Sequence, residues 1–110
     1  MIKNKESVIS YFGYWPEFCD AKIKELNFNS EGTLLISVNY IDSEINKEAL
    51  INIKFIGITE LKMYELRDDN NIDFIEIDDN DEIVVNIEAA SGLSGSLKCK
   101  EVIVKIKNCK

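Results

Sequence analysis

The sequence predicts a mainly β fold, α+β by strict count, with an antiparallel sheet or a two-layer sandwich of about seven strands and one short N-terminal helix. Three observations support this prediction. Apolar and polar residues alternate with a period of two over most of the chain after residue 20. Helical spacing is clear only before Gly13. Successive strands are joined without helical crossovers, so antiparallel pairing is expected.

The predicted helix lies at the N-terminus. Val8, Ile9 and Phe12 fall on one helix face. Asn4 could cap the start of this helix, and Gly13 could end it.

Seven segments have the apolar alternation of a strand. A turn at 29–32 joins the first two into a hairpin, and a phase slip near Lys24 and Glu25 predicts a β-bulge. Segment 58–66 mixes spacings of two and three, which favours a strand over a helix. A sandwich, or a strongly bent sheet covered by the helix, would close the fold. The segments are residues 21–28, 34–40, 49–55, 58–66, 72–77, 83–89 and 97–106.

Length and composition indicate a globular protein. A chain of 110 residues can bury a core without disulfides or metals, so we expect a single domain over residues 1–110. Hydrophobic residues make up 45% and charged residues 30% of the chain, which is not typical of disorder. No apolar run long enough for a signal peptide or a membrane span follows the charged N-terminus, so the cytoplasm is the expected location.

The charge of the protein constrains its partners. The net charge is -7 and the pI is about 4.6. Such a surface repels nucleic acid and anionic membranes, so neither is expected as a partner. A basic protein would be attracted, because opposite charges speed encounter and select partners. The alternative interpretation is that the acidity only keeps the chain soluble.

Residues suited to catalysis are scarce. Histidine, the commonest general base and metal ligand, is absent. The cysteines are odd in number and lack CxxC spacing, which argues against a disulfide framework or a zinc cluster. We expect Cys19, beside Asp20, to be a small buried hydrophobe rather than a nucleophile. Cys99 is expected in the core, and Cys109 is expected to be inert. No catalytic residue or cofactor is predicted.

The acidic turn at residues 78–82 superficially suggests a calcium site. An EF-hand loop needs Gly at its sixth position and a bidentate Glu at its twelfth. Counted from Asp78, those positions hold Ile83 and Ala89. We therefore expect a solvated hairpin turn and no metal site.

Carboxylates are dense between residues 68 and 82. Their density, together with the neighbouring asparagines, implies contact with water rather than a dry catalytic cleft. The stretch is either an ordinary soluble face or a patch that contacts Lys and Arg of a partner protein. The candidate partner-binding residues are Asp68, Asp69, Asp73, Glu76, Asp78, Asp79, Asp81 and Glu82.

Aromatic residues concentrate in one short segment. Exposed, they would form a binding hot spot; buried, they would attach the helix to the sheet. Gly13 and Pro16 enforce a sharp reversal of the chain, which favours burial. The aromatic residues are Tyr11, Phe12, Tyr14, Trp15 and Phe18.

The segment from Phe12 to Ala21 resembles the opening of the bacterial immunity protein 50 family, which typically reads Phe-Gly-x-Trp-Pro-x-Phe-His-Asp-Ala. Segments 55–57 and 92–95 are similar to later parts of that family. The position of the family's His is Cys19 here, and we expect Asp20 to accept hydrogen bonds from nearby backbone amides. The structural motif that the resemblance implies comprises Phe12, Gly13, Trp15, Pro16, Phe18, Cys19 and Asp20.

The resemblance implies an immunity protein that binds and neutralises a cognate bacterial polymorphic toxin in the cytoplasm, and the acidic stretch suggests that this toxin is basic. The alternative is a non-catalytic assembly domain that self-associates through a free strand edge. Either a monomer or a homodimer is compatible with the sequence. An enzyme or a small-ligand protein is the weakest hypothesis, since histidine and a glycine-rich phosphate loop are both missing.

Overall fold

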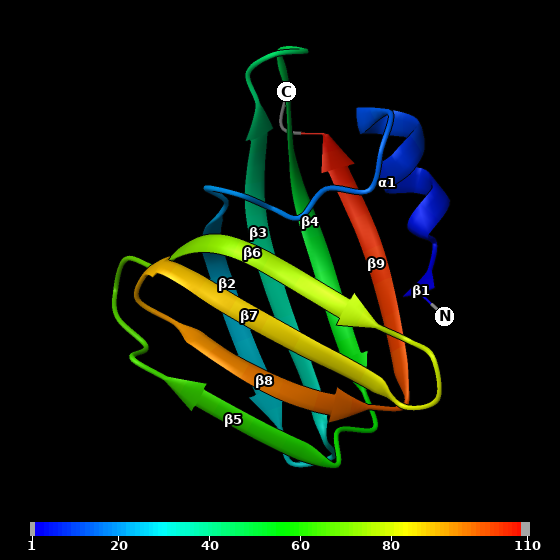
Figure 1. Ribbon diagram of the computed structural model, residues 1–110, viewed down its shortest axis with the longest axis vertical. Coiled ribbons are helices and arrows are strands. Elements are labelled where there is room, and N and C mark those ends of the chain that lie inside the picture. Colours follow the sequence, from blue (N-terminus) through cyan, green and yellow to red (C-terminus); the bar gives the residue numbers. More distant parts are fainter. Residues whose placement is uncertain (1, 109–110) are drawn as a thin grey trace.

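The computed structural model describes residues 2–108 and contains nine strands in one sheet, with a single short helix (Figure 1). The mainly β fold is confirmed. The strand order across the sheet is β1-β9-β4-β3-β2-β6-β7-β8-β5. The elements are β1 (Ile2–Lys3), α1 (Lys5–Phe12), β2 (Lys22–Asn29), β3 (Thr33–Asp42), β4 (Lys47–Ile56), β5 (Glu60–Tyr64), β6 (Asn71–Asp78), β7 (Ile83–Ser91), β8 (Ser94–Cys99) and β9 (Glu101–Asn108).

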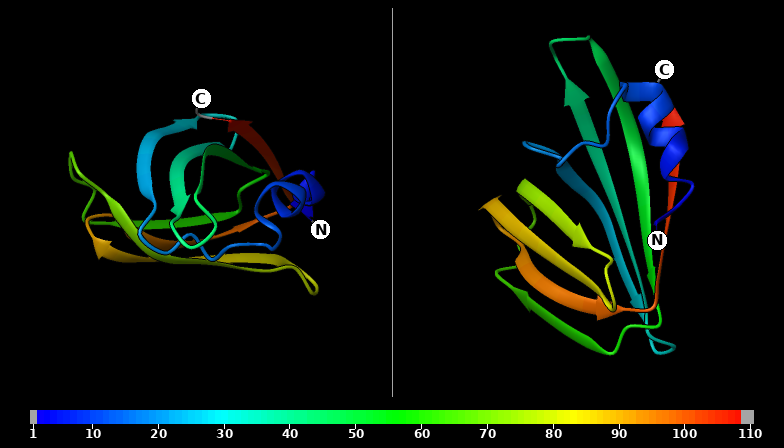
Figure 2. Two further views of the ribbon diagram at one scale, coloured as in Figure 1. Left: turned by 90° about the horizontal axis from the view of Figure 1, so that it is seen from above. Right: turned by 45° about the vertical axis from the view of Figure 1, so that its right-hand side comes forward.

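The sheet bends sharply between β2 and β6. These two strands share one residue pair in the ladder, Lys22 with Asn71. Beyond that pair the second half of the sheet (β6, β7, β8, β5) crosses over the first half (β1, β9, β4, β3, β2), as Figures 1 and 2 show. The strongly bent sheet, one of the two predicted closures, is the observed one.

The facing sides of the two halves form the core. Ile36 and Val38 of β3 are fully buried, as is Ile53 of β4. From the second half, Val85 and Leu97 are buried in the same cluster. The alternation that predicted these strands therefore separates core from solvent, as expected for sheets with one covered face.

Local irregularities in the strands follow the sequence pattern closely. The register between β2 and β3 shifts between Ile23 and Glu25, which confirms the predicted bulge. The ambiguous segment 58–66 contains strand β5, as favoured.

The strand count exceeds the prediction for two reasons. β1 is only two residues long and pairs in parallel with β9, so it is too short to show alternation and departs from the expected antiparallel pairing.

The predicted strand 97–106 divides at Lys100, where the chain passes from one half of the sheet to the other. The Lys100 N–H donates to the Ile56 carbonyl at 3.0 Å, and the Thr59 N–H donates to the Lys98 carbonyl at 2.9 Å. Two chain segments thus turn the same corner together.

Helix α1 buries one side against the core. Val8 and Phe12 are buried, whereas Ile9, predicted on the same face, is exposed. Asn4 is the N-cap residue, but its side chain makes no capping hydrogen bond. Gly13 ends the helix as predicted, at φ 90° with its N–H bonded to the Ile9 carbonyl at 2.6 Å.

The segment after the helix docks on β6. The Ile75 N–H donates to the Glu17 carbonyl, the Asp20 N–H donates to the Ile72 carbonyl, and the Ile72 N–H donates to the Ala21 carbonyl, each at 2.8 Å. Residues 17–21 therefore bond to β6 on the side away from β7. These bonds add to the single β2–β6 residue pair in joining the two halves of the sheet.

Aromatic rings fix the same segment from inside. The Phe18 ring is fully buried and meets Trp15 and Tyr40 edge to face, with ring centroids 5.6 and 5.7 Å apart. Phe12 packs on the other side of Tyr40, at 5.1 Å. The predicted burial is therefore confirmed for Phe12 and Phe18, whereas Tyr11 and Trp15 are partly buried and Tyr14 is exposed.

Tyr14 instead makes a polar bridge to the β3–β4 hairpin. Its hydroxyl donates to Asp42 Oδ2 at 2.6 Å and lies 2.7 Å from the Tyr40 hydroxyl. Because the Tyr14 hydroxyl donates its hydrogen to Asp42, the Tyr40 hydroxyl is the donor in the bond between the two tyrosines. Desolvation, followed by the bonds to Asp42 and Tyr40, raises the pKa of Tyr14 well above its usual value. The hydrogen bond from Tyr14 lowers the pKa of Asp42.

Replacing Phe18 should destabilise the protein severely. Phe18→Ala removes a fully buried ring at the junction of helix and sheet, and we expect a loss of about 3–5 kcal/mol of unfolding free energy in denaturant titrations. The matched control is Phe28→Ala, since Phe28 is 52% exposed; its loss should be about 1 kcal/mol or less. Equal losses for the two variants would contradict the anchoring role of Phe18.

The Tyr14 bridge should make stability depend on pH at both extremes. A raised Tyr14 pKa stabilises the fold below about pH 10, and this contribution fades as the pH rises further. A lowered Asp42 pKa stabilises the fold above about pH 4, and this contribution fades as the pH falls. The stability difference between wild type and Tyr14→Phe, from melting curves, should thus be largest between these limits. Tyr64→Phe is the control, because no described residue bonds to the Tyr64 hydroxyl. A pH-independent difference for Tyr14→Phe would refute the bridge.

Candidate functional site

The eight predicted partner-binding carboxylates form an acidic strip along β6. All of them are exposed. Asp68 and Asp69 precede β6 in the chain, Asp73 and Glu76 lie within it, and the remainder occupy its end and the turn into β7. Since β6 has eight residues, the strip extends over roughly 25 Å at the rise of a strand. The residues are therefore aligned along one strand rather than gathered at a single point.

Few cations compensate the central part of the strip. Glu76 and Asp78 pair across the ladder with Asn86 and Val84 of β7, on the face opposite the buried Ile75. Residues 68–97 contain no Lys or Arg at all. Lys22 reaches Asp69 at 3.8 Å, but both side chains are largely exposed, so this ion pair contributes little. A negative field of one sign therefore extends along β6 from Asp73 to Asp78. In the turn that follows, the hydrogen bond and charge of the N-terminal amino group, followed by Lys5, lower the pKa of Asp79.

The docked segment adds carboxylates that the sequence analysis did not assign to this surface. The Cys19 thiol lies among them, and its pKa is raised by desolvation and then by the negative charges of Asp20, Asp73 and Glu17. Glu17 and Asp20 thus border the strip at Asp73. Their sequence separation from β6 exceeds 50 residues, and only the β6 pairing of the docked segment brings the two regions together.

The prediction that Cys19 is buried is wrong. Phe18 takes a left-handed backbone conformation, at φ 65°, with its ring in the core, and the following Cys19 is exposed. The carboxylates around Cys19 oppose thiolate formation, so it is not an activated nucleophile. Cys99 is buried as predicted, and Cys109 lies outside the described residues.

Asp20 acts through its backbone. It also has a positive φ, 65°, and its N–H donates to Ile72. Within residues 2–108, no backbone amide donates to its carboxylate, contrary to expectation. Its side chain is exposed and faces the Cys19 thiol instead. Asp is one of the few residue types that adopt this backbone conformation at low energy.

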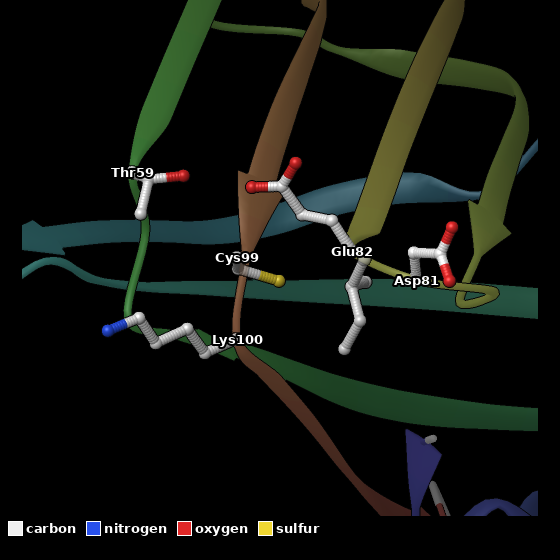
Figure 3. Close-up of a pocket in the computed structure, with 6 residues that line it drawn as sticks. Thr59, Asp81, Glu82, Cys99 and Lys100 are labelled. Carbon is white, nitrogen blue, oxygen red and sulfur yellow. The ribbon is translucent and has the colours of Figure 1, made fainter.

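A hollow of about 330 Å³ lies near the end of β8 (Figure 3). The Cys99 sulfur points towards the side occupied by Asp81 and Glu82, whereas the Lys100 side chain extends the opposite way. Burial raises the pKa of Cys99. The carboxylates of the hollow thus lie on the side to which this thiol points, and burial opposes formation of the thiolate that a nucleophile needs. The lining residues are Thr59, Asp81, Glu82, Ile83, Cys99 and Lys100.

Residues 2–108 also lack the features of a metal site and of a membrane-spanning helix. No cluster of three or more Cys, Asp or Glu side chains in this range could hold a metal ion. The same range contains no helix with the length and apolar character needed to cross a membrane.

Comparison with known proteins identifies a family for this chain. No curated protein and no solved structure matches the chain. The sequence model of the family described as Immunity protein 50 matches residues 4–109. The match includes helix α1, the docked aromatic segment and the acidic strip, and it confirms the resemblance at Phe12 to Ala21. The chain belongs to the immunity protein 50 family.

Proposed function

We propose that this protein binds a basic protein toxin in the cytoplasm and neutralises it, and that the toxin contacts the acidic strip. Membership of an immunity protein family supports a toxin as the partner. The observation that carries the choice of surface is the run of exposed carboxylates along β6, with Glu17 and Asp20 beside it and no cation in residues 68–97. Charge complementarity would speed encounter with a basic toxin and orient it on this face.

The protein neutralises the toxin by covering its active region rather than by modifying it covalently. Without histidine, and with both described cysteines at raised pKa values, the chain has little with which to modify a toxin covalently. The protein instead acts as a rigid acidic surface that covers the active region of its partner. Burial of an interface of the usual size is sufficient for tight inhibition when a few contacts are strong.

The alternative of self-assembly through a strand edge is less well supported. The sheet ends in β1 and β5, of two and five residues. The outward residues of β5 include Glu60 and Lys62. Short, charged strands of this kind discourage pairing with another chain at the two ends of the sheet.

The function is tested by co-expression with the toxin encoded by the neighbouring gene. We expect growth to be rescued and the two proteins to purify as a complex. Failure of both rescue and complex formation would refute an immunity role for this pair.

The surface is tested by neutralising carboxylates in matched sets. The strip variant is Asp73→Asn/Glu76→Gln/Asp78→Asn. Its new amide oxygen at position 78 would replace the Asp78 carboxylate oxygen that accepts the Asn80 N–H at 3.2 Å, so the turn keeps its acceptor. We expect association of this variant with the toxin to slow by about tenfold or more at low ionic strength, and its rate to depend less on salt.

The control variant removes three negative charges elsewhere on the surface, as Glu25→Gln/Glu31→Gln/Glu60→Gln. It has the same net charge as the strip variant, so global attraction to the toxin is matched. Stopped-flow association rates over a range of salt concentrations separate the two cases. Equal slowing in both variants would show that net charge matters and that the strip itself does not.

A further inference from the structure

We propose that the tip of the β3–β4 hairpin is a preformed apolar anchor that inserts into a concave site of the partner, with Ile41 and Ile45 as the inserted side chains. This inference rests on the proposed function and adds to it a second contact, distinct from the acidic strip. The strip governs encounter, and the hairpin tip governs how long the complex lasts.

Apolar side chains are exposed together at this tip. Ile41 is 56% and Ile45 is 43% exposed, and the two lie on either side of Asp42, which closes the hairpin by pairing with Lys47. The exposed Tyr14 bonds to Asp42 on the opposite face of β3 from Ile41, because Ile41 and Asp42 are consecutive residues of the strand. Figures 1 and 2 show the hairpin extending beyond the rest of the sheet. A projection of this shape fits a hollow, not a flat surface.

The tip is held in place by bonds on both of its strands. Asp42 accepts the Tyr14 hydroxyl, and its other carboxylate oxygen accepts the Glu44 N–H at 3.0 Å. On the second strand, the Lys47 ammonium donates to the Tyr11 carbonyl at 2.7 Å, and the Tyr11 hydroxyl donates to the Glu48 carbonyl at 2.9 Å. A loop already ordered before binding loses little conformational entropy in the complex.

Charge around the tip identifies the kind of site that it fits. The acidic residues of the hairpin end are Asp42, Glu44 and Glu48, and Glu48 lies directly opposite Ile41 in the ladder. The one cation of the turn, Lys47, is directed to helix α1, where it lies over the Tyr11 ring at 5.1 Å. An apolar tip with an acidic border is complementary to an apolar cleft with a basic border. On a basic toxin, a cleft that binds an anionic substrate would have such a basic border.

The inference is tested with the purified toxin domain encoded by the neighbouring gene. Ile41→Ser/Ile45→Ser should raise Kd by at least about tenfold, mainly through faster dissociation, with the association rate nearly unchanged. Ile41→Leu/Ile45→Leu should bind within about threefold of wild type, because apolar bulk is retained. The matched control is Tyr64→Ser/Leu66→Ser, two side chains that are 58% and 59% exposed near the end of β5; it should bind as wild type does.

The outcomes separate this inference from the function on which it rests. If wild type binds the toxin and the hairpin variant binds equally well, the anchor is refuted while the immunity role stands. An equal loss of affinity in the Tyr64→Ser/Leu66→Ser control also refutes the anchor, since any exposed apolar side chains would then contribute equally to binding. If wild type itself does not bind, the proposed function fails and the anchor fails with it. Unchanged melting curves for all variants ensure that binding losses reflect the contact, because every substituted side chain is exposed.

Discussion

The docking of residues 17–21 on β6 is the interaction on which the rest of the structure depends. On the β2–β6 side of the bend the two halves of the sheet share one residue pair, so the layers need a further connection there. The backbone bonds of Glu17, Asp20 and Ala21 to β6 provide it, and the Phe18 ring fills the core beneath them. The same segment borders the acidic strip and continues, through Tyr14, to the β3–β4 hairpin. Both proposed contact surfaces are therefore positioned by one element.

Much of the fold could be predicted from the sequence because period-two alternation is a local signal. β3, β4 and β7 have one face in the core along most of their length, and the bulge in β2 appears as a change of phase. The corner at Lys100 produces the same change of phase, but there it marks a passage between the two halves. Nothing within a few residues distinguishes a bulge from a corner, since the difference lies in which strands become neighbours. β1 is too short for any periodicity.

The candidate site was predictable in composition but not in arrangement. Exposure of the acidic residues follows from charge density, and burial of the aromatic cluster follows from Gly13 and Pro16. The error at Cys19 arises because its burial was inferred from neighbours that disfavour a thiolate. Such neighbours limit reactivity, but they do not determine whether a side chain is buried, and Cys19 is exposed beside the buried Phe18. Tyr14 and Asp42 meet only because helix and hairpin converge in three dimensions. Long-range backbone pairing is thus the step at which reasoning from sequence ends.

The most direct measurement of the central claim is amide hydrogen exchange at Ile72 and Ile75. Their N–H groups bond to the Ala21 and Glu17 carbonyls and would otherwise lie on the side of β6 away from β7. If the docked segment is part of the cooperative core, both amides should exchange as slowly as those of β3 and β4. Exchange at the rate of exposed loop amides, while β3 and β4 remain protected, would contradict the account.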